Sequence, residues 1–171
     1  SCVKLYVSEC DFIPGDLIYE DDFQIAVKNP ISENITTRVL QSITMHFVEA
    51  KGLVHNKGGF SGMNIYRGCT HGCIYCDSRS TCYQFTHAFE DIEVKKNAPE
   101  LLEKELRSKR SKRMIGTGSM SDPYMHCEKD LRLMRRCLEI IYRYGFGVTV
   151  LTKSDLILDD IDLLDKINRD T

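Results

Sequence analysis

The sequence predicts an α/β protein with a parallel sheet, and two observations support this fold class. From about Gly59 onward, short apolar segments alternate with longer segments of helical periodicity, giving strand, helix, strand, helix, strand, helix. Three loops of unusual composition, at 67–79, 116–124 and 152–155, each follow one of the expected strands. Chemistry in parallel sheets takes place at the carboxyl ends of the strands, so these loops are expected to share a site.

The composition suits one domain, or one domain with a small appendage, and gives no sign of a membrane protein. The chain has 171 residues, of which 42% are hydrophobic, and its net charge is −2. No global basic field points to nucleic acid, and the local cluster at 107–113 is expected to be a solvated helix end. No run of 18 apolar residues and no signal-peptide pattern occur, which indicates a soluble, cytoplasmic protein.

Residues 1–44 are expected to form an α+β appendage of unknown role. Segments 3–7 and 23–27 have the composition of strands, and the turn-prone Pro14-Gly15 lies between them. A helix is expected over 32–48. No motif that carries chemistry occurs in this part.

The core is expected to occupy residues 45–171 as three strand–helix units. Its elements, in chain order, are a strand at 63–66, a helix opened by Asn97-Ala98-Pro99, a strand at 114–115, a helix over about 128–144, a strand at 148–151 and a final helix. We expect Asp159 or Asp160 to cap the final helix, and Ile161, Leu164 and Ile167 to form its inner face.

The first loop, RGCTHGCIYCDSR at 67–79, holds Cys69, Cys73 and Cys76 within eight positions. Such crowding does not fit a disulfide framework, and in a reducing cytoplasm it indicates a metal site. Thiolates favour zinc, copper(I) or iron–sulfur clusters. A structural zinc needs four ligands, so His71 or Cys82 would have to be the fourth.

A [4Fe–4S] cluster fits this spacing better than zinc does. The cluster takes one ligand per iron, so three cysteines leave one iron open for chemistry. Gly68 and Gly72 allow the backbone to approach a bulky cluster without interference from a Cβ. Zinc fingers use pairs of cysteines, and the sequence has no second C-x₂-C pair. Cys82 and Cys127 are expected to be buried thiols rather than ligands.

The spacing C-x₃-C-x-aromatic-C resembles the signature of the radical S-adenosylmethionine (SAM) superfamily. The longer string NIYRGCTHGCIYCDSR resembles the spore-photoproduct-lyase-like branch, and GTGSMSDPY (116–124) and LTKSD (151–155) match that branch in the same order. The resemblance begins at about Met45 and leaves residues 1–44 outside it. It implies a partial (β/α) barrel of parallel strands, because members have about six βα units and about three are visible here.

The sequence is therefore expected to be either a truncated chain that holds the N-terminal half of such a core or an unusually short member. A half barrel would leave the strand at 148–151 as an unpaired apolar edge, and such edges favour self-association.

The resemblance also implies roles for individual residues. Cys69, Cys73 and Cys76 would bind a [4Fe–4S] cluster, whose open iron would chelate SAM. The positions that match SAM contacts are Tyr75 near the adenine, Gly116, Thr117 and Gly118 at the methionyl amino group, and Ser121 and Lys153 at the carboxylate or ribose. A lysine opposite a carboxylate is favourable in a partly dry site. Taken alone, Tyr75, Ser121 and Lys153 also have ordinary explanations as packing, turn and exposed residues.

The implied activity is reductive cleavage of S-adenosyl-L-methionine to methionine and a 5′-deoxyadenosyl radical that abstracts hydrogen from a substrate. A low-potential flavodoxin or ferredoxin would supply the electron. The substrate stays open, nucleic acid included. The alternative is a binding module, stabilised by zinc or a cluster, that catalyses no reaction.

One departure from the family pattern bears on the type of reaction. In spore photoproduct lyase, the segment matching 119–122 reads Cys-Thr-Ser-Asp, and its cysteine returns a hydrogen atom to the product radical. Here the segment reads Ser-Met-Ser-Asp. A serine O–H bond is too strong for that transfer, so the sequence predicts an enzyme other than a true spore photoproduct lyase.

Overall fold

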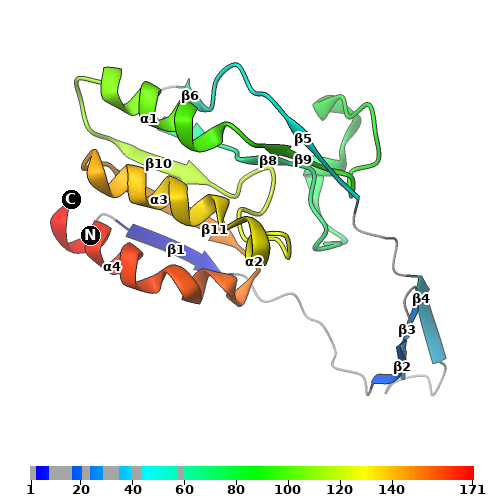
Figure 1. Ribbon diagram of the computed structural model, residues 1–171. Coiled ribbons are helices and arrows are strands. Elements are labelled where there is room, and N and C mark those ends of the chain that lie inside the picture. The colour runs from blue at the N-terminus through cyan, green and yellow to red at the C-terminus, as the bar shows by residue number, and fades with distance from the viewer. Residues whose placement is uncertain (1–2, 8–16, 21–23, 29–34, 40–43, 58–59) are drawn as a thin grey trace.

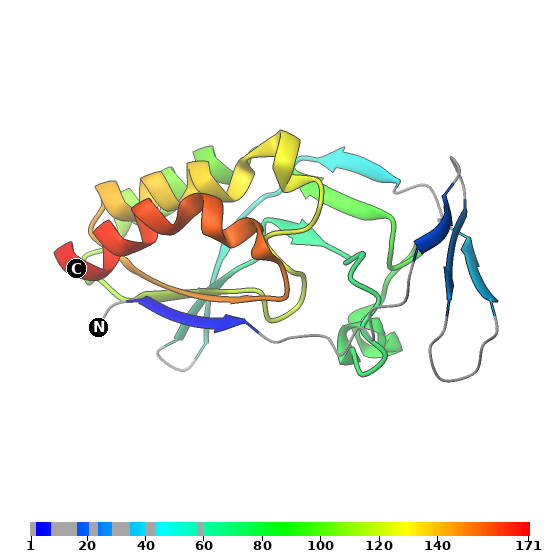
Figure 2. The same ribbon diagram turned by 90° about the horizontal axis from the view of Figure 1, so that it is seen from below.

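A five-stranded sheet, covered on one face by three helices, forms the main part of the computed structural model (Figures 1 and 2). The structure describes residues 3–7, 17–20, 24–28, 35–39, 44–57 and 60–171. The strands of the described residues, in all sheets, are β1 (Val3–Val7), β2 (Leu17–Glu20), β3 (Gln24–Lys28), β4 (Ile35–Val39), β5 (Met45–Val48), β6 (Val54–Lys57), β7 (Phe60–Met63), β8 (Tyr66–Arg67), β9 (Ile92–Lys95), β10 (Met114–Thr117) and β11 (Gly147–Thr152). The α-helices are α1 (Ala98–Ser108), α2 (Glu128–Leu131), α3 (Leu133–Arg143) and α4 (Ile161–Asp170), and the 3₁₀ helices are η1 (Asp77–Arg79), η2 (Thr81–Tyr83) and η3 (Asp155–Asp160).

The five-stranded sheet has the order β1-β11-β10-β7-β6 and is mostly parallel. Its parallel pairs are β1 with β11, β11 with β10, and β10 with β7, whereas β6 runs antiparallel to β7. β10 and β11 therefore end at the same edge of the sheet, where chemistry in α/β proteins is usually found.

Two smaller sheets complete the described part. β9 pairs in parallel with β5 and antiparallel with β8, which leads into the cysteine loop. β2, β3 and β4 form an antiparallel sheet that lies to one side of the molecule in both views (Figures 1 and 2). The chain is thus an α/β protein with mixed sheets, and the described strands form no closed barrel.

The helices follow the apolar periodicity of the sequence. α3 packs between α1 and α4, and it buries Met134, Leu138 and Ile141 at spacings of three and four residues. Leu102 and Leu106 of α1 are fully buried in the same way. These three helices bury the apolar face of the sheet, which is the main source of stability for such a layer.

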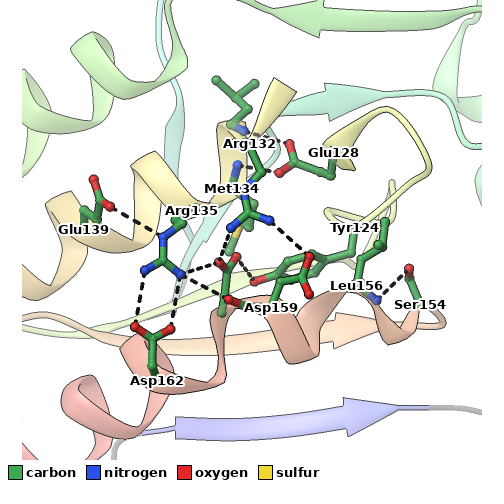
Figure 3. A network of polar contacts seen from close by, with 12 residues as sticks. Tyr124, Glu128, Arg132, Met134, Arg135, Glu139, Ser154, Leu156, Asp159 and Asp162 are labelled. Carbon is green, nitrogen blue, oxygen red and sulfur yellow. Dashed lines mark hydrogen bonds and ion pairs between the residues drawn. The ribbon is translucent and has the colours of Figure 1, made fainter. Parts of the chain in front are cut away.

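The helix expected over 128–144 is divided in two, because Arg132 adopts a left-handed conformation with φ of 48°. The carboxylate of Glu128 accepts hydrogen bonds from the backbone N–H groups of Leu133 (3.1 Å) and Met134 (3.0 Å), as Figure 3 shows in part. A buried carboxylate therefore satisfies two of the free N–H groups at the start of α3. Tyr66 donates a further hydrogen bond to Glu128.

A polar network joins α3 to the segment before α4 (Figure 3). Arg135 donates to Asp160 Oδ1 (2.9 Å) and to both carboxylate oxygens of Asp162 (3.2 Å each). Tyr124 donates to the other oxygen of Asp160 (3.0 Å). Because Tyr124 lies in the loop after β10, the network also fixes that loop against η3.

Three sequence-based expectations for single elements are wrong. The helix expected over 32–48 is replaced by β4 and β5 in its described parts, because the β-branched run from Ile35 to Val39 pairs with β3 and β5 pairs with β9. The strand expected at 63–66 is divided between β7 and β8, which belong to different sheets. Ile161 is 49% exposed, and Leu163 is buried in its place.

The expectation of an unpaired edge at 148–151 is also wrong. β11 pairs along its length with β1, so that Val148 lies opposite Val3. The first described segment of the chain therefore belongs to the main sheet. The turn expected at Pro14-Gly15 lies outside the described residues.

Within the residues that the structure describes, none of the helices has the length and apolar character needed to cross a membrane.

Candidate functional site

A cavity of about 300 Å³ lies where the three unusual loops meet. The cysteine loop follows β8, the second loop follows β10, and the third follows β11. The residues that line the cavity are Cys69, His71, Cys73, Tyr75, Cys76, Asp77, Ser78, Gly118, Ser119, Met120, Asp122, Leu151, Thr152 and Lys153. Segments separated by up to 84 positions (69 to 153) thus line one cavity, although β8 belongs to a different sheet from β10 and β11.

All three cysteines of the 67–79 loop line the cavity. Gly68 has φ of +91°, and a Cβ at this position would lie 2.5 Å from the carbonyl oxygen of Phe89. The same carbonyl accepts a hydrogen bond of 3.0 Å from the N–H of Cys69. Only glycine allows this close approach, so Gly68 sets the position at which Cys69 enters the cavity.

Burial raises the pKa of Cys69 above its ordinary value. The free thiol is therefore protonated at neutral pH, and it would lose its proton on binding a metal.

The other described cysteines differ from these three. Cys82 is exposed, Cys137 is buried and Cys127 is half-buried, and none of them is among the described residues that line the cavity. Cys82 was expected to be buried, and this is wrong because its segment, η2, lies on the surface. Burial, together with the charge of Glu128, raises the pKa of Cys127 to about 11.

Gly118 brings the second loop into contact with β11. Its φ is +98°, and a Cβ here would lie 1.8 Å from the carbonyl oxygen of Leu151. The neighbouring Gly116 and Thr117 are buried within β10, and Ser121 is also buried. The resemblance assigns Gly116, Thr117, Gly118 and Ser121 to SAM contacts. Of these four residues, Gly118 alone lines the cavity.

Asp122 is the residue that joins the three loops. Its buried carboxylate accepts hydrogen bonds from Thr152 Oγ1 (2.7 Å) and from the backbone N–H groups of Lys153 (2.7 Å) and Tyr124 (2.8 Å). The ring nitrogen Nε2 of His71, in the cysteine loop, lies 3.2 Å from the same carboxylate. Burial opposes ionisation of Asp122, but these partners outweigh it and lower its pKa.

Tyr75 of the 67–79 loop and Lys153 of the 152–155 loop contact each other at the cavity. Lys153 Nζ donates to the hydroxyl of Tyr75 (2.6 Å) and lies 4.9 Å from the centre of its ring. Tyr75 is 65% exposed. The pair thus presents a cation and an aromatic face at an accessible part of the cavity.

The sequence offers His71 only as a possible fourth zinc ligand or a loop residue, and Asp122 only as part of a turn. Their contact with each other leaves no local pattern, because the two residues lie in different loops. The one signal for Asp122 was its place in a loop that follows a strand of the parallel sheet.

The cavity suits a group that takes three thiolates. The three soft donors come from one loop, and the backbone of Gly118 faces the same space without a side chain. Cys69 and Cys73 each directly follow a glycine with positive φ, since Gly68 and Gly72 have φ of 91° and 67°. A bulky iron–sulfur cluster fits this combination of donors and open backbone.

Comparison with known proteins gives relatives without a described activity. No family model matches the chain, and no solved structure matches it significantly. It is similar to an uncharacterized protein of Methanocaldococcus jannaschii, with 37% identity over 108 residues, which are 62% of this chain and 40% of that protein. Uncharacterized proteins of Mycobacterium tuberculosis and Mycobacterium bovis are 29% identical over 139 residues, or 71% of this chain and 39% of theirs.

The chain therefore spans about 40% of the length of the curated relatives it matches. Their names state no activity, and a function has to be inferred from the residues of the site.

Proposed function

We propose that this chain carries the cofactor site of a radical SAM enzyme. The observation that carries the proposal is the shared cavity: the three-cysteine loop, the 116–124 loop and the 151–155 loop all line it. These are the same three segments that resemble the spore-photoproduct-lyase-like branch. We further propose that the mostly parallel sheet is part of a (β/α) barrel.

In this proposal, Cys69, Cys73 and Cys76 hold a [4Fe–4S] cluster, and SAM occupies the remaining space of the cavity. When bound, the cluster and SAM supply one-electron reductive cleavage, which gives methionine and a 5′-deoxyadenosyl radical that abstracts hydrogen from a substrate. A flavodoxin or ferredoxin would be the electron donor.

The residues of the chain bind and orient the cofactors. Lys153 provides a positive charge for the carboxylate of SAM, and Tyr75 provides an aromatic surface for its adenine. The backbone of Gly118 leaves room for the methionyl amino group. Gly116, Thr117 and Ser121, which also match SAM contacts in the resemblance, are buried and do not line the cavity.

Asp122 has a positioning role in this arrangement. Its hydrogen bonds to Thr152 and to the N–H of Lys153 hold the third loop, and its contact with His71 holds the cysteine loop. A site built from three loops needs such a connection, because small displacements of catalytic groups reduce rates strongly.

The proposal is tested by incubating the anaerobically reconstituted protein with SAM and a strong reductant, and by measuring 5′-deoxyadenosine. We expect its formation to require all three cysteines of the 67–79 loop and to persist in Cys82→Ala, since Cys82 is exposed away from the cavity. Metal binding without any SAM binding or cleavage would instead favour the alternative of a binding module.

A further inference from the structure

A second cluster of metal-binding side chains lies outside the cavity, between β5, β9 and the segment before β9. One ring nitrogen each of His46 and His87 and a carboxylate oxygen of Glu93 lie within 4.8 Å of one another. Among the described residues, this is the only group of three such side chains at that spacing. His46 lies on β5, and Glu93 lies opposite it on the parallel strand β9.

The hydrogen bonds of His87 show that its ring faces two acceptors. Nδ1 lies 2.9 Å from the carbonyl oxygen of Ala88, which can only accept, so Nδ1 carries a proton. Nε2 lies 2.8 Å from Glu93 Oε1, which is also an acceptor when ionised. This second contact therefore needs a positive charge, supplied either by a second ring proton or by a cation that both atoms bind.

His46 is oriented in a comparable way. Its Nδ1 lies 3.0 Å from Asp91 Oδ1, so this nitrogen donates to a carboxylate and the lone pair of the neutral ring is on Nε2. A histidine whose other nitrogen donates to a carboxylate or a backbone carbonyl is the usual arrangement around a protein-bound metal. Both histidines of this cluster have it.

We propose that His46, His87 and Glu93 form a binding site for a divalent transition-metal ion of the Zn²⁺ type. Two imidazoles and one carboxylate are a common zinc ligand set, with a fourth position left for water or another ligand. The ion replaces the proton on Nε2 of His87. Binding at about 2.0–2.2 Å from each atom requires the imidazole and the carboxylate to move apart by roughly half an ångström.

The site is accessible and has nearby charges that modulate it. The side chains of His46, His87 and Glu93 are 42%, 20% and 18% exposed. Asp91 adds negative charge, since its other oxygen lies 3.8 Å from His87 Nδ1. Arg67 opposes it, because its guanidinium lies 3.8 Å from Glu93.

The proposed ion would stabilise the segment from His87 to Glu93, which contacts the cysteine loop. Phe89, whose carbonyl binds the N–H of Cys69, lies between His87 and Glu93 in the sequence. Phe85 and Phe89 also pack edge to face, with ring centres 5.1 Å apart. A metal that links His87 to Glu93 of β9 and to His46 of β5 therefore restrains the segment on which Cys69 depends.

The test uses the full chain with Cys69, Cys73 and Cys76 replaced by Ser, so that their thiolates cannot compete for the metal. We expect it to bind one equivalent of Zn²⁺ in calorimetric titration. Co²⁺ should bind at the same site with an absorption spectrum that lacks thiolate charge-transfer bands. Asp91→Asn in this background should weaken binding by about 10–100-fold.

Matched variants decide the assignment. His87→Ala and His46→Ala should each abolish the stoichiometric binding, whereas His55→Ala, at an exposed position of β6, should leave it unchanged. Circular dichroism establishes that each variant is folded. Absence of binding in the triple-Ser chain, or equal affinity in His87→Ala, would overturn the proposal. The result is independent of the cluster site, since the three cysteines are absent throughout.

Discussion

Asp122 is a single side chain that contacts all three loops of the cavity. Its carboxylate accepts hydrogen bonds from Thr152 and Lys153 on the third loop and lies 3.2 Å from His71 Nε2 on the first, and Asp122 is itself part of the second loop. Its carboxylate is buried, so each lost hydrogen bond leaves a polar group without a partner.

We predict that Asp122→Asn reduces the free energy of unfolding by about 2 kcal/mol at pH 7, because an amide supplies one acceptor oxygen in place of two. The pKa of Asp122 is lowered in the folded chain, so the ionised carboxylate stabilises the fold above its unfolded-state pKa. This contribution is lost as the pH falls through the folded-state pKa. Urea unfolding of both chains across the acidic range checks this, and a difference that grows toward low pH would contradict it.

Gly118 offers a second test at the scale of one residue. Gly118→Ala places a methyl group against the Leu151 carbonyl in a backbone conformation that favours glycine, and we expect a loss of about 1–3 kcal/mol with weaker SAM binding. Gly52→Ala is the control, because its Cβ would lie 3.5 Å from the nearest atom. Equal effects of the two substitutions on unfolding would contradict the expected role of Gly118.

The start of α3 depends on a side chain from α2. Glu128→Ala removes the acceptor for the N–H groups of Leu133 and Met134 and removes one partner of the Tyr66 hydroxyl. We predict a loss of about 2–4 kcal/mol in unfolding free energy, at the high end for a single substitution because several buried groups lose partners. Thermal or urea unfolding measures it. The exposed Asp130→Ala serves as a control, and a similar loss there would refute the assignment.

Elements with a strong local pattern could be predicted from the sequence. The periodic apolar positions of α1 and α3 and the β-branched run of β11 led to correct elements because each buries one continuous face. The break at Arg132 could not be predicted, since it depends on the Glu128 carboxylate folding back onto α3. Residues 32–48 were misassigned because their apolar spacing does not reveal that β5 pairs with β9.

The candidate site also has features that could be predicted from the sequence and features that could not. Three cysteines on one loop form a local motif, so their place in a cavity could be predicted. The connection of Asp122 to His71 exists only in three dimensions. The His46, His87 and Glu93 cluster likewise unites segments up to 47 positions apart (46 to 93), and no spacing rule would have found it.

At the scale of the whole molecule, the N-terminal segment and the core are connected. β1 extends the main sheet beside β11, although it lies outside residues 45–171, where the sequence predicts the core. The sheet edge that was expected to be open is therefore covered by the chain itself.

The proposed reaction should differ from the repair of spore photoproduct. Among the described residues, Ser119 and Met120 line the cavity and Cys127 does not. In a complete chain, we predict SAM cleavage with little or no repair of spore-photoproduct DNA, because a serine hydroxyl does not give a hydrogen atom to a carbon radical. Chromatography of treated DNA measures repair, and efficient repair that persists in Cys127→Ala would refute this prediction.

The most direct test of the proposed cofactor site is the metal content of the chain after anaerobic reconstitution with iron and sulfide. We predict about four irons and four sulfides per chain, as one [4Fe–4S] cluster requires, with a visible spectrum that changes when SAM is added. Replacing any one of Cys69, Cys73 and Cys76 by Ala should remove most of the iron, and Cys82→Ala should not. A thiolate-bound zinc ion in place of iron, lost as completely in Cys82→Ala as in Cys73→Ala, would contradict the proposed site.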